Sequence, residues 1–429
     1  MKLTRRFTLG ALATAGCNAL PREEGPRSPQ FPYGVAVGDP SATGGLAWTR
    51  YVGSDSLRVD VWPKDEPTNV RSVEATVMDH GISLVALDGL RSGQWYSYAF
   101  VAHRAGAEVD RSDEGRFRTA LAPGVSAPLR FGVSSCSRQS YPLTPLTRIS
   151  QEFECDAFLF LGDTVYADGA TDLPSYREKW GEALTRRPQR LLRQSTGIIS
   201  TWDDHEIVND ASGDRVPAER LEAARRATFE HQPWRADMQA PQRLWRSLEF
   251  GATAEVFVLD CRSERSRSKN EYVSRAQLDW LKAGLAASTA TFKLVLNSVP
   301  ITSYPGAFFQ VFAPDRWEGF PEQRREVLEF IDATPISGLL WLTGDFHMGV
   351  AGRVSRDGVG SKQVELAAGP AGQFSNPSLS YPSGPQFDFS TAVNNAVVLD
   401  LEPATRTARV RFLDGGTRTL FDTTYELGR

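Results

Sequence analysis

The sequence predicts two structural units, an N-terminal β-sandwich followed by a larger α/β domain. Its length of 429 residues exceeds the usual span of one compact domain. Residues 31–119 read as short β segments separated by turn signals. After residue 129 the pattern changes to apolar strands that alternate with amphipathic helical stretches, which is typical of an α/β domain.

The composition is that of a soluble globular protein, with 41% hydrophobic and 23% charged residues. No stretch reaches the apolar length that spans a bilayer. The net charge is −4, and the chain has no long basic stripe. Because binding to duplex nucleic acid requires a basic footprint, we expect no such partner.

Residues 1–30 are interpreted as an export signal and a flexible leader. Lys2, Arg5 and Arg6 precede a short apolar run that ends in small residues. Residues 4–9, Thr-Arg-Arg-Phe-Thr-Leu, resemble a twin-arginine signal, which directs folded proteins to the twin-arginine export machinery. We therefore expect export across a bacterial inner membrane, to the periplasm, the cell surface or the medium. The alternative, a buried N-terminal helix, conflicts with the paired arginines and the Pro- and Gly-rich stretch that follows.

The four cysteines do not form a disulfide framework. Cys17 is a candidate lipidated first residue of the mature chain, although a lipobox normally has Leu three residues earlier, where Thr14 stands. The remaining three, Cys136, Cys155 and Cys261, are too few and odd in number for a disulfide scaffold. We expect Cys155 and Cys261 to be reduced packing residues, which leaves Cys136 in need of another explanation.

The N-terminal β-sandwich is placed at residues 31–122, with a linker from Pro123 to Pro128. Residues 45–50, 57–62 and 95–101 are its clearest strands. Residues 87–98 resemble the end of a fibronectin type III-like domain, where a turn leads into an aromatic strand. The expected role of this segment is packing.

The α/β domain is placed at residues 129–429. Residues 218–229 and 277–285 are predicted helices. The predicted strands are residues 129–133, 157–161, 197–202, 255–259, 293–296 and 338–342. Five of them end at a polar cluster, and ligands of α/β proteins gather at the carboxyl ends of strands. These clusters are therefore candidate functional sites.

Four of the clusters carry groups that bind metals. They are Ser134-Ser135-Cys136-Ser137, residues 162–168 with Asp163 and Tyr166, Trp202-Asp203-Asp204-His205-Glu206, and Gly344-Asp345-Phe346-His347. Thiolate, phenolate, carboxylate and imidazole groups are not tolerated together as buried charges unless a cation compensates them. Taken singly, each has a simpler reading: Cys136 as a small buried hydrophobe, Tyr166 as packing, and Asp163 or Asp345 as a turn carboxylate.

The order of these clusters resembles the metallophosphoesterase fold, and within it the PhoD-like alkaline phosphatase family. Residues 31–40, 259–262, 277–281 and 317–321 also match. The resemblance implies an αββα sandwich preceded by a β-sandwich domain. It also implies hydrolysis of phosphate mono- or diesters by metal-activated water.

The resemblance implies two metal sites that share Asp163. Cys136, Tyr166 and His347 complete the first site, which suits Fe³⁺, whereas cysteine and histidine alone suggest zinc. The second site has oxygen donors and suits Ca²⁺, with Mg²⁺ or Mn²⁺ as substitutes. Its expected ligands are Asp204, Asn297 and Asp345. Asn297 is equally well read as a turn residue at the end of a strand.

His205 matches the family histidine that contacts phosphate oxygens or protonates the leaving group. Asp204 is expected to orient it through the second metal, and Asp203 to fix the turn. The other three histidines are read as structural. Four arginines are candidate phosphate clamps, although arginines more often form ion pairs. They are Arg138, Arg177, Arg262 and Arg265.

Two alternatives remain open at this point. A phospholipase D-like enzyme of the same family would act on a phospholipid, and residues 316–320 are expected to cap the site and influence this choice. A surface-attached binding protein with purely structural metals is the alternative from another class. We expect a monomer.

Overall fold

The computed structural model describes residues 24–235, 243–374, 382 and 384–428. The twin-arginine segment and Cys17 lie outside the described residues. Among the helices that are described, none combines the length and the apolar character needed to cross a membrane.

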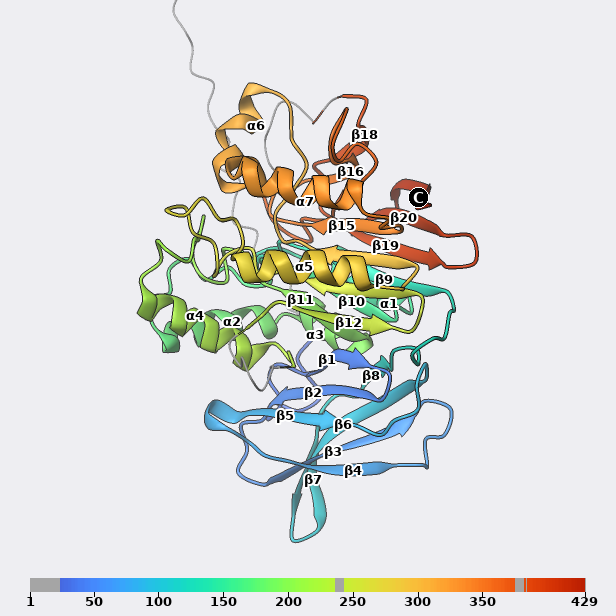
Figure 1. The fold of residues 1–429 in the computed structure, drawn as a ribbon. Coiled ribbons are helices and arrows are strands. Elements are labelled where there is room, and N and C mark those ends of the chain that lie inside the picture. Colours follow the sequence, from blue (N-terminus) through green and yellow to red (C-terminus); the bar gives the residue numbers. More distant parts are fainter. Residues whose placement is uncertain (1–23, 236–242, 375–381, 383, 429) are drawn as a thin grey trace, which may run out of the picture.

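Two sheets form the centre of the molecule (Figure 1). The first has nine strands, in spatial order β21 (Thr419–Glu426), β20 (Thr407–Asp414), β19 (Asn395–Glu402), β9 (Leu129–Ser134), β10 (Ala157–Leu161), β11 (Gly197–Thr201), β1 (Val35–Ser41), β2 (Gly44–Arg50) and β5 (Ile82–Leu87). The second has seven: β12 (Arg246–Phe250), β13 (Ala254–Val258), β14 (Phe292–Leu296), β15 (Leu339–Thr343), β17 (Val364–Ala367), β16 (Gly349–Arg353) and β18 (Phe387–Thr391). The strands β9 to β11, and β13 to β15 with β17, run parallel.

Alternation of side chains along the strands builds four layers. In β10, Leu159 and Leu161 share one core with β13, whereas Phe158 and Phe160 pack with α1 (Thr144–Glu152) and α3 (Arg187–Ser195). The helices α5 (Arg275–Ala287) and α7 (Pro321–Ala333) cover the outer face of the second sheet. Because successive side chains of a strand point to opposite faces, each sheet contacts its neighbour sheet and its own helices. The predicted αββα sandwich is confirmed.

The other helices lie at the edges of these layers. They are α2 (Leu173–Leu184), α4 (Ala218–His231), α6 (Ala307–Val311) and the 3₁₀ turns η1 (Asp79–Gly81), η2 (Ala313–Asp315) and η3 (Trp317–Gly319). The predicted helices at 218–229 and 277–285 fall within α4 and α5. The α2 helix begins at a capping box, in which the Asp172 side chain accepts from the Ser175 amide at 3.0 Å.

The N-terminal strands form the lower part of Figure 1, in blue. A five-stranded sheet contains β4 (Arg71–Ala75), β3 (Ser56–Pro63), β6 (Trp95–Arg104), β7 (Ala107–Arg111) and β8 (Gly115–Arg118). It packs on β1, β2 and β5 to give the β-sandwich. However, β1 also pairs in parallel with β11, with Val37 opposite Gly197. One layer of the N-terminal sandwich is therefore a continuation of the nine-stranded sheet.

A buried ion pair secures this junction. Asp39 in β1 is 1% exposed and accepts from both Nε and Nη2 of Arg246 in β12, at 2.8 and 2.7 Å. Bidentate pairs of this kind hold both position and orientation. The matched stretch at residues 31–40 thus has a structural role in joining the first strand to the body of the protein.

Candidate metal centre

The predicted metal ligands follow the carboxyl ends of parallel strands in the two central sheets. Cys136 follows β9, Asp163 follows β10, and Asp345 and His347 follow β15. All four adopt left-handed backbone angles, with φ values of 52°, 54°, 60° and 53°. Such angles cost non-glycine residues about 1–3 kcal/mol each and cluster at functional sites. The backbone is therefore bent at these four points to direct their side chains.

Two of the predicted ligands of the first site, Cys136 and Tyr166, contact the same carboxylate oxygen of Asp163. Asp163 Oδ2 accepts from Tyr166 Oη at 3.2 Å and from Cys136 Sγ at 3.5 Å. Tyr166 Oη is also 3.3 Å from His347 Nε2. Donor atoms of Cys136, Asp163 and His347 lie within 4.8 Å of one another. The four residues of the predicted first site are thus brought together.

Without a cation, the acid forms of this group are favoured. Burial, followed by the charge of Asp163, raises the pKa of the Cys136 thiol and of the Tyr166 phenol well above their ordinary values. Burial also raises the pKa of Asp163. For His347, burial and then the positive charge of His205 lower the pKa to about 4, which keeps the imidazole neutral. A bound cation reverses this balance for thiol and phenol, because it stabilises their anions.

A second group contains Asp203, Asp204 and Asp345, whose oxygens lie within 4.8 Å of one another. Asp163, Asp204 and His205 form an overlapping group. Among the described residues, Asp203 Oδ2 and Asp204 Oδ1 are buried without a hydrogen-bond partner. Buried carboxylate oxygens normally have partners, so these two fit an oxygen-preferring divalent cation.

Arg262 lies against the acidic group as a fixed, fully buried cation. Its Nε donates to Asp203 Oδ1 at 2.5 Å and its Nη2 to Asp345 Oδ1 at 3.1 Å. Its Nη1 donates to Asp315 Oδ2, in η2, at 2.7 Å. Burial alone lowers the pKa of Arg262, but the surrounding carboxylates outweigh it and raise the pKa well above its ordinary value. The sequence left two roles open for Arg262, a phosphate clamp and an ion pair. The structure shows the ion pair.

His205 is oriented by Asp168, a residue that the sequence analysis did not single out. The Nδ1 atom of His205 is 2.8 and 2.9 Å from the two carboxylate oxygens of Asp168. The ring lies 4.1 Å from the ring of Tyr166, centroid to centroid. Burial alone lowers the pKa of His205, but Asp163, Asp168 and Asp204 together raise it to about 10. The available signal was that Asp168 is the second carboxylate of the 162–168 cluster.

Glu206 is a second residue missed from the sequence. It is 1% exposed, and its carboxylate accepts the backbone N–H groups of Asp163, Thr164 and Asp203 at 3.0, 2.5 and 2.9 Å. It therefore joins the loop after β10 to the loop after β11. Burial raises its pKa to about 7. Its position at the end of the 202–206 cluster was the only sign of this role.

Asn297 lies at the end of β14 and is fully buried. Its Oδ1 accepts from Trp317 Nε1 at 3.0 Å and from Cys261 Sγ at 3.1 Å, whereas its Nδ2 has no partner among the described residues. Its role as a ligand stays a prediction. Together with the contact between Arg262 and Asp315, the bond to Trp317 anchors residues 315–317 against the acidic group.

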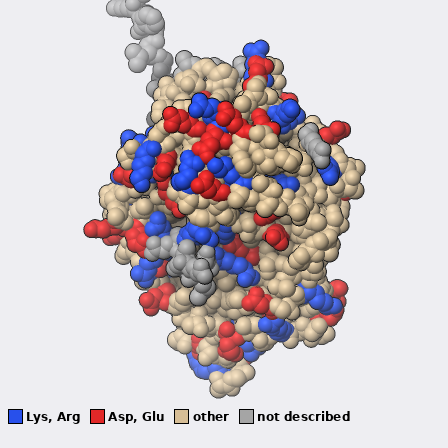
Figure 2. Space-filling model, in the orientation of Figure 1, with Lys and Arg blue, Asp and Glu red and all other residues tan. Residues whose placement is uncertain are grey.

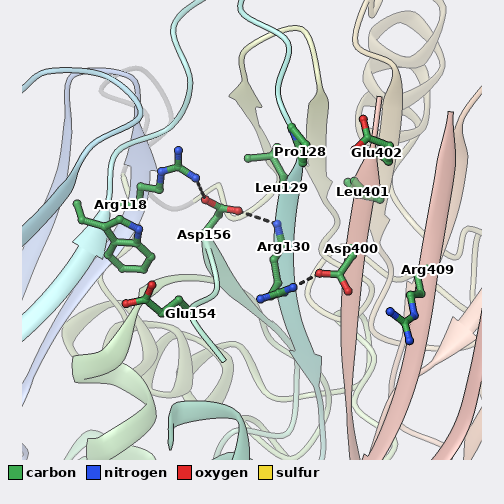
Figure 3. Close-up of a pocket in the computed structure, with 11 residues that line it drawn as sticks. Arg118, Pro128, Leu129, Arg130, Glu154, Asp156, Asp400, Leu401, Glu402 and Arg409 are labelled. Atoms are coloured by element: carbon green, nitrogen blue, oxygen red, sulfur yellow. Dashed lines mark hydrogen bonds and ion pairs between the residues drawn. The ribbon is translucent and has the colours of Figure 1, made fainter. Parts of the chain in front are cut away.

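A separate cavity of about 530 Å³ lies at the opposite end of β9, and Figure 3 shows residues that line it. A six-residue strand places this cavity about 20 Å from Cys136. Two ion pairs join residues that line it, Arg118 with Asp156 and Arg130 with Asp400, both at 2.5 Å. The cavity is therefore a charged junction between the N-terminal and larger parts, and none of the predicted ligands lines it.

Two family models match the chain. Residues 131–412 match the PhoD-like phosphatase model, and residues 16–121 match the model of the PhoD-like phosphatase N-terminal domain. The matched regions contain every residue of the two groups described above and the N-terminal β-sandwich.

Individual relatives agree with these models. The chain is 25% identical to alkaline phosphatase D of Bacillus subtilis, over 82% of this chain and 70% of that protein. It shares its fold with a solved structure of PhoD, at a TM-score of 0.77, 21% identity and 94% coverage of each chain. It also shares its fold with purple acid phosphatase PPD1 from yellow lupin, at a TM-score of 0.70 and 14% identity, over 91% of this chain and 73% of that one. The protein therefore belongs to the PhoD-like phosphatase family of phosphoric ester hydrolases.

Proposed function

We propose that the protein is an exported phosphoesterase with a mixed-metal centre. Cys136, Tyr166 and His347 would hold Fe³⁺, and Asp163 would be shared with a second site. The observation that carries this proposal is the convergence of the thiol and the phenol on Asp163 Oδ2, beside His347 Nε2. Ferric iron accepts thiolate and phenolate ligands and compensates several anions at once.

The second site is proposed to bind Ca²⁺, with Mg²⁺ or Mn²⁺ as substitutes. Asp204 and Asp345 supply hard oxygen donors, and Asn297 is the third proposed ligand. The unpartnered oxygens of Asp203 and Asp204 support this choice of cation. The Arg262 guanidinium limits the negative charge of the group, which suits a divalent rather than a trivalent ion.

His205 is proposed as the acid that protonates the leaving alkoxide. Its Nδ1 is committed to Asp168, so Nε2 is the nitrogen that faces substrate. Bound cations would supply polarisation of the phosphoryl group and a water molecule of lowered pKa for attack on phosphorus. Asp204 lies beside His205 and helps to hold its protonated form. No covalent intermediate with the protein is required.

The proposed substrates are small phosphate monoesters and diesters, in a compartment outside the inner membrane. The name of the Bacillus relative, alkaline phosphatase D, supports a phosphoester substrate. The twin-arginine-like segment at residues 4–9 supports export of the folded protein.

The test uses full-length protein exported by its native route and purified without chelator. We expect turnover of p-nitrophenyl phosphate or bis(p-nitrophenyl) phosphate, its loss on calcium chelation, and recovery when Ca²⁺ is restored. His205→Gln is expected to lower kcat about 100- to 10,000-fold while metal content is unchanged. If the metal-loaded protein hydrolyses neither ester, the enzyme proposal is wrong and a binding protein with structural metals takes its place.

A further inference from the structure

Arg138 is an exposed arginine beside the candidate metal centre. It follows Cys136 by two residues, and its guanidinium lies 5.4 Å from the centroid of the Tyr166 ring. The hydroxyl of the same ring contacts Asp163 and His347. Arg138 therefore reaches the solvent-facing side of the first ligand group.

The backbone of Arg138 is fixed although its side chain is exposed. Its N–H donates to the Gly372 carbonyl at 2.9 Å, and its carbonyl accepts from the Tyr141 N–H at 3.0 Å. The neighbouring Gln139 side chain accepts from the Tyr166 N–H at 3.2 Å and donates to the Tyr166 carbonyl at 3.1 Å. These bonds hold the start of the Arg138 side chain at a constant distance from the metal ligands. Sites built in this way position a ligand accurately.

Arg138 differs from the other three candidate clamps in having no carboxylate partner. Arg177 pairs with Glu230 at 2.6 Å, whereas Arg262 and Arg265 pair with Asp315 at 2.7 and 2.8 Å. Within the part of the chain that the structure describes, the Arg138 guanidinium makes no hydrogen bond or ion pair, and it lies over the ring of Tyr166. It is the arginine of this set that is free to bind an anion.

We propose that Arg138 binds a non-bridging phosphoryl oxygen of the substrate and gives the enzyme a preference for dianionic phosphomonoesters over monoanionic phosphodiesters. This inference rests on the proposed phosphoesterase function. A phosphomonoester carries close to two negative charges above its second pKa of about 6. A diester carries one, and its second ester group replaces an oxygen that the guanidinium would bind. The planar fork of arginine matches two oxygens of one phosphoryl group.

The test compares Arg138→Met and Arg138→Lys with the parent protein on p-nitrophenyl phosphate and bis(p-nitrophenyl) phosphate. We expect kcat/KM for the monoester to fall about 10- to 100-fold in Arg138→Met, and that for the diester to fall less than about threefold. Arg138→Lys should recover part of the monoester loss, because it keeps the charge but lacks the fork. Arg104→Met, which removes an exposed arginine of the N-terminal sheet, should change neither value.

Equal losses for the two esters, or an unchanged monoester value, would overturn the inference. Equilibrium binding of inorganic phosphate, measured by calorimetry on the metal-loaded proteins, separates it from the proposed function. We expect Arg138→Met to weaken phosphate binding about 10-fold or more. If the parent protein hydrolyses neither ester, the proposed function fails, and unchanged phosphate affinity in Arg138→Met would then overturn the role of Arg138 as well.

Discussion

Replacing Arg262 with methionine should destabilise the protein by about 3–5 kcal/mol in the absence of divalent cations. Methionine fills a similar volume but removes the buried positive charge. The Arg262 guanidinium donates to Asp203, Asp315 and Asp345 at 2.5, 2.7 and 3.1 Å, and no part of the side chain is exposed. The substitution therefore leaves three carboxylates that lose their shared partner.

The size of this destabilisation follows from an upper limit and from the usual cost of breaking a buried ion pair. Hydrogen bonds to charged groups contribute about 1.5–3 kcal/mol each, so three of them give an upper limit of about 9 kcal/mol. Protonation reduces this loss, because burial already raises the pKa of Asp203 and of Asp345. Breaking a buried ion pair by removing one partner typically costs about 3–5 kcal/mol, and this is the loss expected for Arg262→Met.

The assay is urea unfolding followed by circular dichroism, in chelator and then in Ca²⁺. We expect Ca²⁺ to stabilise Arg262→Met more than the parent protein, because the cation replaces part of the lost positive charge. Arg325→Met is the matched control. This side chain is 67% exposed and pairs with Glu329 at 3.9 Å, so its removal should cost less than about 0.5 kcal/mol. A loss below about 1 kcal/mol in Arg262→Met would refute the reasoning.

Three further substitutions test neighbouring parts of the structure. Asp168→Asn keeps an acceptor for His205 Nδ1 but removes the negative charge of Asp168, so kcat should fall about 10- to 100-fold. An unchanged pH–rate profile would show that Asp168 does not hold the protonated form of His205. Glu206→Gln places an amide N–H where a carboxylate oxygen accepts from the Thr164 N–H or a neighbouring N–H. The free energy of unfolding, measured in urea, should therefore fall by about 1–3 kcal/mol. No measurable change would contradict the hydrogen bonds described. Burial lowers the pKa of His231 to about 4 from an ordinary 6.5. Above pH 6.5 the His231 ring is neutral in both the folded and the unfolded chain, and the folded protein has its full stability. Between pH 6.5 and 4 the ring takes up a proton in the unfolded chain but not in the folded protein. The free energy of unfolding therefore falls by up to about 3 kcal/mol over this range. The difference in unfolding free energy between the parent and His231→Gln should therefore change over this range, and parallel pH curves would show that His231 does not titrate as described.

The strands and the strand-end positions of the candidate ligands could be predicted from the sequence because they depend on local patterns. The apolar run at 157–161 matches β10 in full, and the run at 293–296 covers β14 except for its first residue, Phe292. The polar clusters at strand ends follow from the general position of ligands in α/β proteins. Cys136, Asp163 and His347 were candidates because each follows such a strand, whereas their assignment to one metal site came from the family resemblance.

Contacts between distant segments could not be predicted in the same way. Nothing in residues 35–41 indicates that β1 extends the sheet of the larger domain, since any apolar strand can pair at a sheet edge. The choice of Arg262 between phosphate and carboxylate partners depends on its burial, which appears only when the loops are folded together. The distribution of surface charge could not be predicted either. Figure 2 shows acidic and basic side chains interspersed on one face, a pattern that the net charge of −4 does not describe.

The visible absorption spectrum of the natively exported protein, recorded with its metal content, tests the central proposal most directly. Phenolate and thiolate bound to ferric iron give charge-transfer absorption in the visible range. We predict stoichiometric iron and a visible band that is weakened or shifted in Tyr166→Phe and in Cys136→Ser, with ester hydrolysis reduced in both. A colourless, fully active protein that contains zinc in place of iron would contradict the proposed metal centre.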